Sequence, residues 1–296
     1  MSDKKTLWQY HVLLIPGVIL LIIFNVIPMG GIIMAFQDFV PARGILGSEF
    51  VGLRHFRTMM MFPDIRQVFA NTLIIATSKI VLNIVVAVAF AILLNEIKFL
   101  AYKRFVQTIV YMPHFISWVI LAVMFNNIFS YTGIFNQIVA FFGGEPQLWL
   151  VSNTWFRPII IVTDVWKSFG FGAIIYLAAI SNIDPNMYEA ASIDGAGRMR
   201  KIWHITLPTI KPTVILVSTL ALGGILSAGF EQIFTMISPL VYETGDIIDT
   251  YVFRMGLIRM QFSFGTAVGL LRSVVALILI LLSYKLAQKF AGYSIF

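Results

Sequence analysis

Six long apolar segments constrain the fold of this chain more than any other feature of its sequence. Each segment reaches the ~20 residues that an α-helix needs to cross the hydrocarbon core of a bilayer. A segment surrounded by lipid must satisfy its own backbone hydrogen bonds, so a spanning segment is predicted to be helical. The sequence therefore predicts an all-α integral membrane protein with six transmembrane helices, at about 10–36, 68–94, 105–129, 155–180, 209–236 and 264–286.

The composition agrees with this class and excludes several others. Of 296 residues, 59% are hydrophobic and 12% are charged, whereas soluble domains are about half apolar and a quarter charged. An ordinary soluble enzyme and a disordered chain are therefore excluded. The chain has no Cys, which excludes disulfides, thiolate nucleophiles and Cys-ligated metals. Its four His residues have no metal-ligand spacing, so no metal site is expected.

The distribution of basic residues predicts the orientation. With the N-terminus inside, the inner segments hold eleven Lys and Arg residues and the outer segments hold seven. Cytoplasmic loops carry this excess, so the chain is predicted to be N-in and C-in, and the net charge of +7 needs no nucleic-acid partner. The first apolar segment is too long for a signal peptide and is predicted to be retained. Residues 1–296 are interpreted as one transmembrane domain with long outer segments at 37–67 and 238–262.

The inner loop 182–208 contains signals for a helical hairpin. Asp184 followed by Pro185 predicts a helix start, with a capping carboxylate before proline at the first helical position. Gly195 can end that helix or turn the chain sharply. A second short helix is predicted at 199–206, ending at Leu207–Pro208. The hairpin either docks a partner surface, which its small Ala side chains would allow to approach, or rests on lipid.

Residues of this loop resemble the EAA motif of ABC importer permeases. Glu189-Ala190-Ala191 is followed by Gly195 and then by an Ile-x-Leu-Pro sequence from Ile205 to Pro208, at the spacing of that motif. Other segments are similar to the sugar-permease branch, among them Phe50-Val-Gly-Leu53 and Ser227-Ala-Gly-Phe-Glu-Gln-Ile-Phe234. Within that branch the chain is most similar to permeases for complex oligosaccharides derived from plants or polysaccharides.

The resemblance implies a type I ABC importer permease fold and a non-enzymatic role in the bacterial cytoplasmic membrane. It implies a second, homologous permease subunit that forms a heterodimer, two cytoplasmic ATPase subunits and an extracellular solute-binding protein. ATP and Mg would be bound by the ATPases, because this chain has no Gly-Lys pair and hence no Walker motif. The residues that the resemblance assigns to ATPase coupling are Glu189, Ala190, Ala191, Asp194, Gly195, Ala196, Ile205, Leu207 and Pro208.

Five charged residues lie within the apolar segments: Lys79, Asp164, Lys167, Glu231 and Arg272. Such a residue costs about 2.5–3.5 kcal/mol at a helix centre, so it usually pairs or faces a cavity. Asp164 and Lys167 are predicted to pair, because they are three residues apart on one helix. Lys79 and Arg272 are candidates to pair across helices or to line the path.

A sugar path needs aromatic faces for the rings and polar groups for the hydroxyls. Aromatic residues cluster on the third, fourth and fifth predicted helices, although lipid contact or helix packing is the alternative for each. The candidate path residues are Tyr111, Phe115, Trp118, Asp164, Trp166, Lys167, Phe171, Phe230, Glu231 and Arg272.

Two other classes of function are weighed against an importer subunit. A secondary transporter or channel could use the intramembrane charges, but such transporters often contain inverted repeats, and none is evident. An integral-membrane enzyme would need a convergent acid–base or metal constellation, and the sequence has none.

Overall fold

The structure is a computed structural model that describes residues 4–291, and its elements are almost entirely helical. Five segments are long and apolar enough to cross a membrane: Tyr10–Phe36, Pro63–Asn95, Phe156–Ser181, Arg198–Gly223 and Phe262–Leu282. A sixth crossing results if the helices Leu100–Phe115 and Trp118–Ile128, bent by 100° at a short break, form one span. The all-helical class with five to six candidate spans therefore agrees with the sequence prediction.

The chain divides into two compact units, the first made of residues 1–65 and 251–273. In this unit α1 (Lys4–Leu21) continues through a π-helical turn (Ile22–Val26) and α2 (Ile27–Met29) into a 3-10 helix (Gly30–Phe36). Next come a short antiparallel pair, β1 (Gln37–Asp38) with β2 (Glu49–Phe50), the intervening α3 (Gly44–Gly47), and α4 (Arg54–Met61). The Phe39 amide donates to Ser263 Oγ at 2.9 Å, which ties the pair to the start of α16 (Phe262–Ala291).

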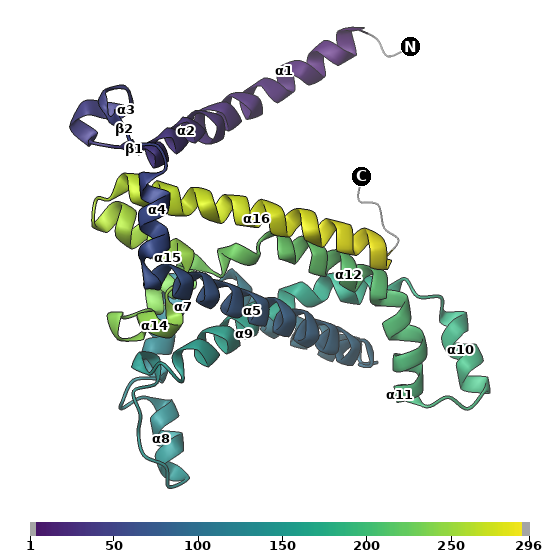
Figure 1. Ribbon diagram of the computed structural model, residues 1–296. Helices are drawn as coiled ribbons and strands as arrows, with labels where there is room; N and C mark the ends of the chain where they lie inside the picture. The colour runs from purple at the N-terminus through teal and green to yellow at the C-terminus, as the bar shows by residue number, and fades with distance from the viewer. Residues whose placement is uncertain (1–3, 292–296) are drawn as a thin grey trace. The chain divides into compact units, whose positions relative to one another are not determined.

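The second unit consists of residues 66–250 and 274–296. It contains most of α5 (Pro63–Asn95), then α6 (Leu100–Tyr111), α7 (Trp118–Ile128), α8 (Ile134–Phe141) and α9 (Phe156–Ser181) (Figure 1). The hairpin follows with α10 (Pro185–Ile193) and α11 (Arg198–Lys201). The remaining helices are α12 (Leu207–Gly223), α13 (Phe230–Met236) and α14 (Tyr242–Gly245). The division between the units also cuts α15 (Ile248–Phe253) and α16, whose part from residue 274 belongs to the second unit.

The core of the second unit joins the hairpin to the long helices. Small residues of α5 and α9 let the helices approach closely, and larger side chains from the loop and α12 fill the space beside them. The buried cluster contains Ala87, Ala91, Ala173, Tyr176, Ile180, Ile183, Ile205 and Ile210. Because members of this cluster come from both sides of loop 182–208, the hairpin is anchored at its base.

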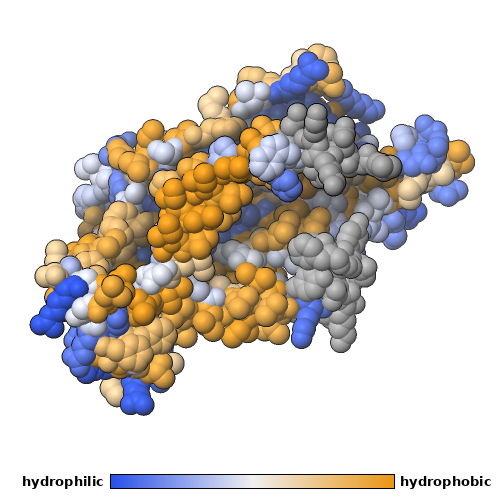
Figure 2. Space-filling view, turned by 90° about the horizontal axis from the view of Figure 1, so that it is seen from above, coloured by the Kyte–Doolittle hydropathy of each residue, from blue (hydrophilic) through white to orange (hydrophobic). Residues whose placement is uncertain are grey.

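Large apolar side chains cover much of the outer surface. Orange residues dominate much of the face seen in Figure 2. On α5, for example, Val81, Val85 and Leu93 are more than half exposed. A soluble monomer rarely exposes apolar patches of more than a few hundred square ångströms. The surface therefore suits contact with lipid, as the composition predicted.

Two of the predicted helices differ from the structure. The segment predicted at 105–129 is broken after the 3-10 turn Met112–Phe115, where Pro113 lacks an N–H and Ser117 begins α7 as its N-cap. The segment predicted at 209–236 begins earlier, at Arg198, and ends at Gly223. Ala228 and Gly229 then have positive φ values of 25° and 89°, which no helix allows, and α13 starts beyond them.

The prediction that the hairpin's second helix ends at Leu207–Pro208 is also wrong. A π-helical turn at Ile202–Thr206 joins α11 to α12, and the Leu207 amide donates to the Ile202 carbonyl. Pro208 lies in the first turn of α12. The missing N–H of proline is tolerated in the first turn of a helix, so the helix continues through this position.

Candidate functional site

A cavity of about 430 Å³, open on one side, lies among helices of the second unit. Its walls come from α5, α9 and α12, from the 3-10 turn before α7, and from the broken segment between α12 and α13. Most of the lining is apolar, and a few polar side chains point into it from α5 and α9. Ligand sites in proteins have this combination of an apolar wall with a small number of placed polar groups.

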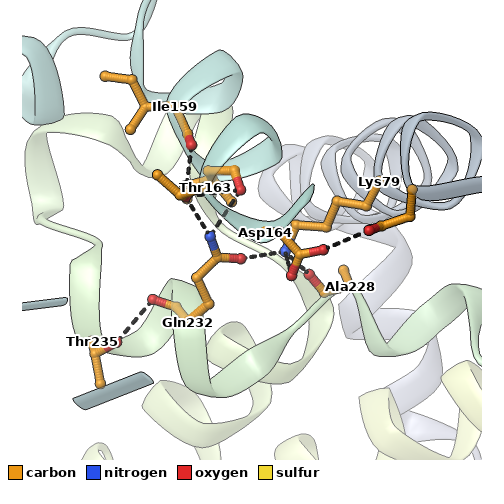
Figure 3. Close-up of polar contacts among 9 residues, drawn as sticks. Lys79, Ile159, Thr163, Asp164, Ala228, Gln232 and Thr235 are labelled. Carbon is orange, nitrogen blue, oxygen red and sulfur yellow. Dashed lines mark hydrogen bonds and ion pairs between the residues drawn. The ribbon is translucent and has the colours of Figure 1, made fainter. Parts of the chain in front are cut away.

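Lys79 is the central polar residue of this region. Its Nζ lies 3.4 Å from Asp164 Oδ1 and donates hydrogen bonds to the Ala228 carbonyl at 2.8 Å and to Gln232 Oε1 at 2.5 Å (Figure 3). The Lys79 side chain is 7% exposed and that of Asp164 is 18% exposed. A buried ammonium requires such partners, because its desolvation is otherwise very unfavourable.

Gln232 extends the network to the next helix. Its amide nitrogen donates to the Ile160 carbonyl at 2.8 Å and to Thr163 Oγ1 at 2.9 Å, while its oxygen accepts from Lys79 (Figure 3). Lys79 is on α5, Thr163 and Asp164 are on α9, and Gln232 is on α13. The network therefore joins three helices around the chain break.

The conformation of the break depends on Gly229. Its φ of 89° is in the left-handed region, and a Cβ at this position would lie 2.7 Å from Lys79 Nζ. Glycine avoids both the conformational penalty and the clash. The break thereby brings the Ala228 carbonyl to the buried ammonium.

Three buried polar atoms in the cavity wall have no hydrogen-bond partner among the described residues: Asn83 Oδ1, His114 Nδ1 and Tyr176 OH. A buried unsatisfied polar group costs about 1–3 kcal/mol, so such groups often mark a site that something else completes. The other amide atom of Asn83, Nδ2, donates to Asp164 Oδ2 at 3.1 Å. The His114 ring stacks on Phe171 with a centroid distance of 4.1 Å. The wall thus offers both unpaired polar atoms and aromatic faces.

Some of the residues predicted for the substrate path line the cavity, and others lie behind its wall or away from it. Asp164 and Phe171 line the cavity. Phe115 packs edge-on against Phe171, and Lys167 Nζ donates to the His114 carbonyl at 2.8 Å. Lys167 Nζ also lies 5.5 Å from the centre of the Trp118 ring. Phe115, Lys167 and Trp118 therefore form a layer behind the His114–Phe171 wall.

The other predicted path residues do not line the cavity. Trp166 packs against Phe125, and Phe230 stacks on Phe234. Glu231 is exposed in the first turn of α13. Tyr111 is at the end of α6, and Arg272 belongs to the other unit.

The predicted pairing of Asp164 with Lys167 is wrong. Residues three apart on a helix lie on the same side and can interact, so spacing alone does not prevent this pair; each side chain instead has a partner from another part of the chain. Asp164 meets Lys79, and Lys167 meets a carbonyl. The sequence prediction also missed Asn83, His114 and Gln232, although Asn83 lies one helical turn from Lys79 within an apolar segment.

The hairpin has the local geometry that its sequence predicted. Asp184 Oδ1 accepts a hydrogen bond from the Asn186 amide at 2.9 Å, and Pro185 is the first residue of α10. At the other end Gly195 has φ 75°, its amide donates to the Ser192 carbonyl at 3.1 Å, and the Ala196 amide donates to the Ala191 carbonyl at 2.8 Å. This pair of bonds is a Schellman ending, for which glycine is the usual residue. The predicted helix start and turn are confirmed.

The nine residues predicted for coupling lie in one hairpin but in two environments. Glu189, Ala190, Asp194 and Gly195 are exposed together with Pro208, and Ala196 is half-buried. Ala191 and Leu207 pack against the buried core cluster, of which Ile205 is a member. Tyr188 OH also lies 2.9 Å from Thr206 Oγ1 across the hairpin. The free surface is thus the α10 side and its turn, whereas Ile205 and Leu207 hold the hairpin in place.

Comparisons with known proteins identify relatives of this chain. Residues 83–292 match the family described as binding-protein-dependent transport system inner membrane component. The chain is 42% identical over 287 residues to the polygalacturonan/rhamnogalacturonan transport system permease protein YteP of Bacillus subtilis (strain 168), covering 97% of this chain and 89% of that protein.

Two solved structures have the same fold. One is a bacterial alginate ABC transporter in complex with an alginate pentasaccharide-bound periplasmic protein, with a TM-score of 0.90, 35% identity and 99% of each chain covered. The other is a bacterial ABC transporter involved in the import of the acidic polysaccharide alginate, with a TM-score of 0.89, 36% identity and 98% of each chain covered.

We expect the buried ion pair to behave as a unit in stability measurements. Lys79→Met leaves the Asp164 carboxylate without its cation, and Asp164→Leu leaves the ammonium without its anion. Breaking a buried pair in this way costs about 3–5 kcal/mol. The double variant removes both charges and should be more stable than the sum of the single effects predicts.

Thermal unfolding in detergent, followed by loss of the monodisperse chromatographic peak, measures this effect. Thr235→Ala is a suitable control, because Thr235 bonds only to carbonyls of its own helix, those of Glu231 and Gln232. Strictly additive losses in the double variant would show that Lys79 and Asp164 are not coupled.

Proposed function

The chain belongs to the binding-protein-dependent transport system inner membrane component family, and on this basis we propose that it is the transmembrane subunit of an ATP-driven oligosaccharide importer. The observation that carries the proposal is the anchored hairpin, whose exposed Glu189–Ala190 side and Gly195 turn stand free of the core. A hairpin that only rested on lipid would not need the residues of the EAA motif. A docking element for a cytoplasmic ATPase needs a rigid protruding helix with small side chains, and α10 is such a helix.

The proposed assembly contains a second, homologous permease, two ATPase subunits and an extracellular solute-binding protein. One of the similar structures is a transporter solved with its oligosaccharide-bound periplasmic protein, which supports the last of these partners. ATP and Mg would be held by the ATPases. We place the chain in the bacterial cytoplasmic membrane with six spans and both termini inside, since the basic residues favour that orientation.

The proposed coupling would run from the hairpin to the membrane helices through contacts that the chain makes with itself. The second arm of the hairpin, from Arg198, is continuous with α12 through the π-helical turn, so the two form one candidate span to Gly223. The first arm is held to this span by the Tyr188–Thr206 bond and by the buried Ile205. A pull on α10 by closing ATPases would therefore be transmitted to α12, which lines the cavity. The expected change is rigid-body rocking of packed helices.

We propose that the cavity receives part of the oligosaccharide. Aromatic faces such as Phe171 can contact the apolar side of a sugar ring. Tyr176 OH, His114 Nδ1 and Asn83 Oδ1 have no partner within residues 4–291 and can bond its hydroxyls. Because one of the similar transporters is described as importing an acidic polysaccharide, acidic oligosaccharides are the first substrates to test.

Purification with mass spectrometry tests the assembly directly. The tagged chain is extracted from its own membranes in mild detergent, and the proteins that accompany it are identified. We expect a Walker-motif ATPase and a second permease of about the same size. Recovery of the chain alone, or with copies of itself only, would contradict the proposal and favour a secondary transporter or channel.

The hairpin turn offers a matched pair of variants for coupling. Gly195 requires a left-handed conformation, so Gly195→Val is strained by at least about 1–2 kcal/mol. Gly197 has φ −70° and open space around it, so Gly197→Val should be accommodated. We expect ATP hydrolysis without uptake in the Gly195 variant and near-normal uptake in the Gly197 variant. Equal uptake by both variants, measured in reconstituted vesicles, would remove Gly195 from coupling.

The cavity hypothesis predicts opposite effects on stability and on uptake for Tyr176→Phe. The phenol oxygen has no partner among the described residues, so its removal should leave thermal stability unchanged or increase it. If the phenol bonds the sugar, loss of about 1 kcal/mol should weaken apparent affinity roughly fivefold. Tyr131→Phe, at an exposed position outside the cavity, is the control. Unchanged uptake kinetics in Tyr176→Phe would exclude this contact.

A further inference from the structure

Helix α8 presents an apolar face that no described residue covers. Ile134, Ile138 and Phe141 follow the i, i+4, i+7 spacing of one helix face and are 58%, 50% and 85% exposed. Phe142, at the end of the helix, is 82% exposed and packs edge-on against Phe141. Large side chains gathered in this way on one side of a helix usually contact something other than water.

The opposite side of α8 is fixed by a complete set of hydrogen bonds. Asn136 is 1% exposed. Its Oδ1 accepts from Trp149 Nε1 at 2.8 Å and from the Gln147 amide at 3.0 Å, and its Nδ2 donates to the Ser130 and Gln147 carbonyls. The Phe135 ring packs edge-on against Trp149 at 5.0 Å. The orientation of the apolar face is therefore set by the structure of the loop and is not that of a freely moving segment.

The chain that leads into α8 also passes very close to the end of α7. A Cβ on Gly133 would lie 2.4 Å from the carbonyl oxygens of Asn127 and Ile128. Only glycine allows the chain to pass so close to the end of α7. The start of α8 is thus held directly against the end of a membrane helix.

The position of α8 in the chain places it at a membrane boundary. It lies between α7, which completes the bent span, and α9, which is a span of 26 residues. At 1.5 Å per residue α9 is about 39 Å long, so α8 and the α10 hairpin are at opposite ends of a membrane-crossing element. Figure 1 shows α8 projecting steeply away from the direction of α9. A helix with this direction can lie along the membrane surface.

The charge pattern favours lipid as the occupant of this face. No Asp, Glu, Lys or Arg occurs between Arg104 and Glu145. The exposed surface of the preceding span, with Val119, Ile120 and Val123 each more than half exposed, is equally apolar. The face of α8 therefore continues a lipid-facing surface along the chain. A water-soluble protein partner would be expected to meet a polar rim around an apolar centre, and Gln137 is the only strongly polar exposed side chain of the helix.

We infer that α8 is an interfacial anchor that inserts Ile138, Phe141 and Phe142 into the acyl chains of the leaflet opposite the hairpin. Interfacial helices bury an apolar face about 5–10 Å into the boundary between head groups and acyl chains. The anchor would fix the height of the α7–α9 connection relative to the bilayer. The inference does not depend on the nature of the transported substrate.

The absence of cysteine makes the test direct. Ile138→Cys and Phe141→Cys give single labelling sites on the apolar face, and Glu145→Cys is the matched control beyond Gly143 and Gly144 in the same loop. The full chain is spin-labelled together with cysteine-free versions of the subunits that accompany it, and the assembly is placed in nanodiscs of phosphatidylethanolamine and phosphatidylglycerol. Collision rates are measured with oxygen, which concentrates in lipid, and with a neutral nickel chelate, which stays in water.

We expect the oxygen-to-nickel ratio to be several-fold higher at 138 and 141 than at 145. A ratio at 138 and 141 equal to that at 145 would place the face in water and overturn the inference. Shielding of both positions from both reagents would also overturn it, because a protein would then cover the face. If one variant fails to assemble, the other of the pair decides, since both side chains point to the same side of the helix.

Discussion

The buried ammonium of Lys79 is the interaction on which the interior of the larger unit depends. An amine in an apolar membrane helix must find enough partners to replace water, and here they come from Asp164, the Ala228 carbonyl and Gln232. Two of these partners lie at or beyond the point where the α12 helix has ended. The chain can stop being helical inside the protein because the buried Ala228 carbonyl, which has no helical partner, accepts a hydrogen bond from Lys79 there. The Lys79 ammonium, the broken segment between α12 and α13 and the cavity beside them therefore depend on one another.

A second physical requirement applies to the hairpin, which has to be rigid although it lies outside the core. A short helix is marginal by itself, and α10 has only nine residues. Its N-cap, its Schellman ending and its contacts with Ile205 and Thr206 supply the missing stability. The Glu189–Ala190 surface is therefore presented on a helix that is tied to the start of α12, as the proposed docking of an ATPase requires.

Sequence patterns predicted correctly those elements whose bounds are set by neighbouring residues. The span at 156–181 was predicted to within one residue, and the start and turn of α10 followed from Asp184, Pro185 and Gly195. The same reasoning failed for features that depend on residues far away in the sequence. Hydropathy cannot reveal the bend after Met112–Phe115, because the helices on both sides of it are apolar. It also could not find the break at Ala228–Gly229, whose stability comes from a lysine about 150 positions earlier. The partner of Asp164 was missed for the same reason, because helical spacing describes neighbours on one helix and not those across helices.

The short distance between Lys79 and Asp164 has an electrical consequence. Moving one uncompensated elementary charge through a membrane potential of 100 mV changes the free energy by about 2.3 kcal/mol. Two opposite charges 3.4 Å apart that travel together carry almost no net charge, so the potential does very little work on them. The pair itself therefore adds almost nothing to any dependence of these helices on the voltage across the membrane.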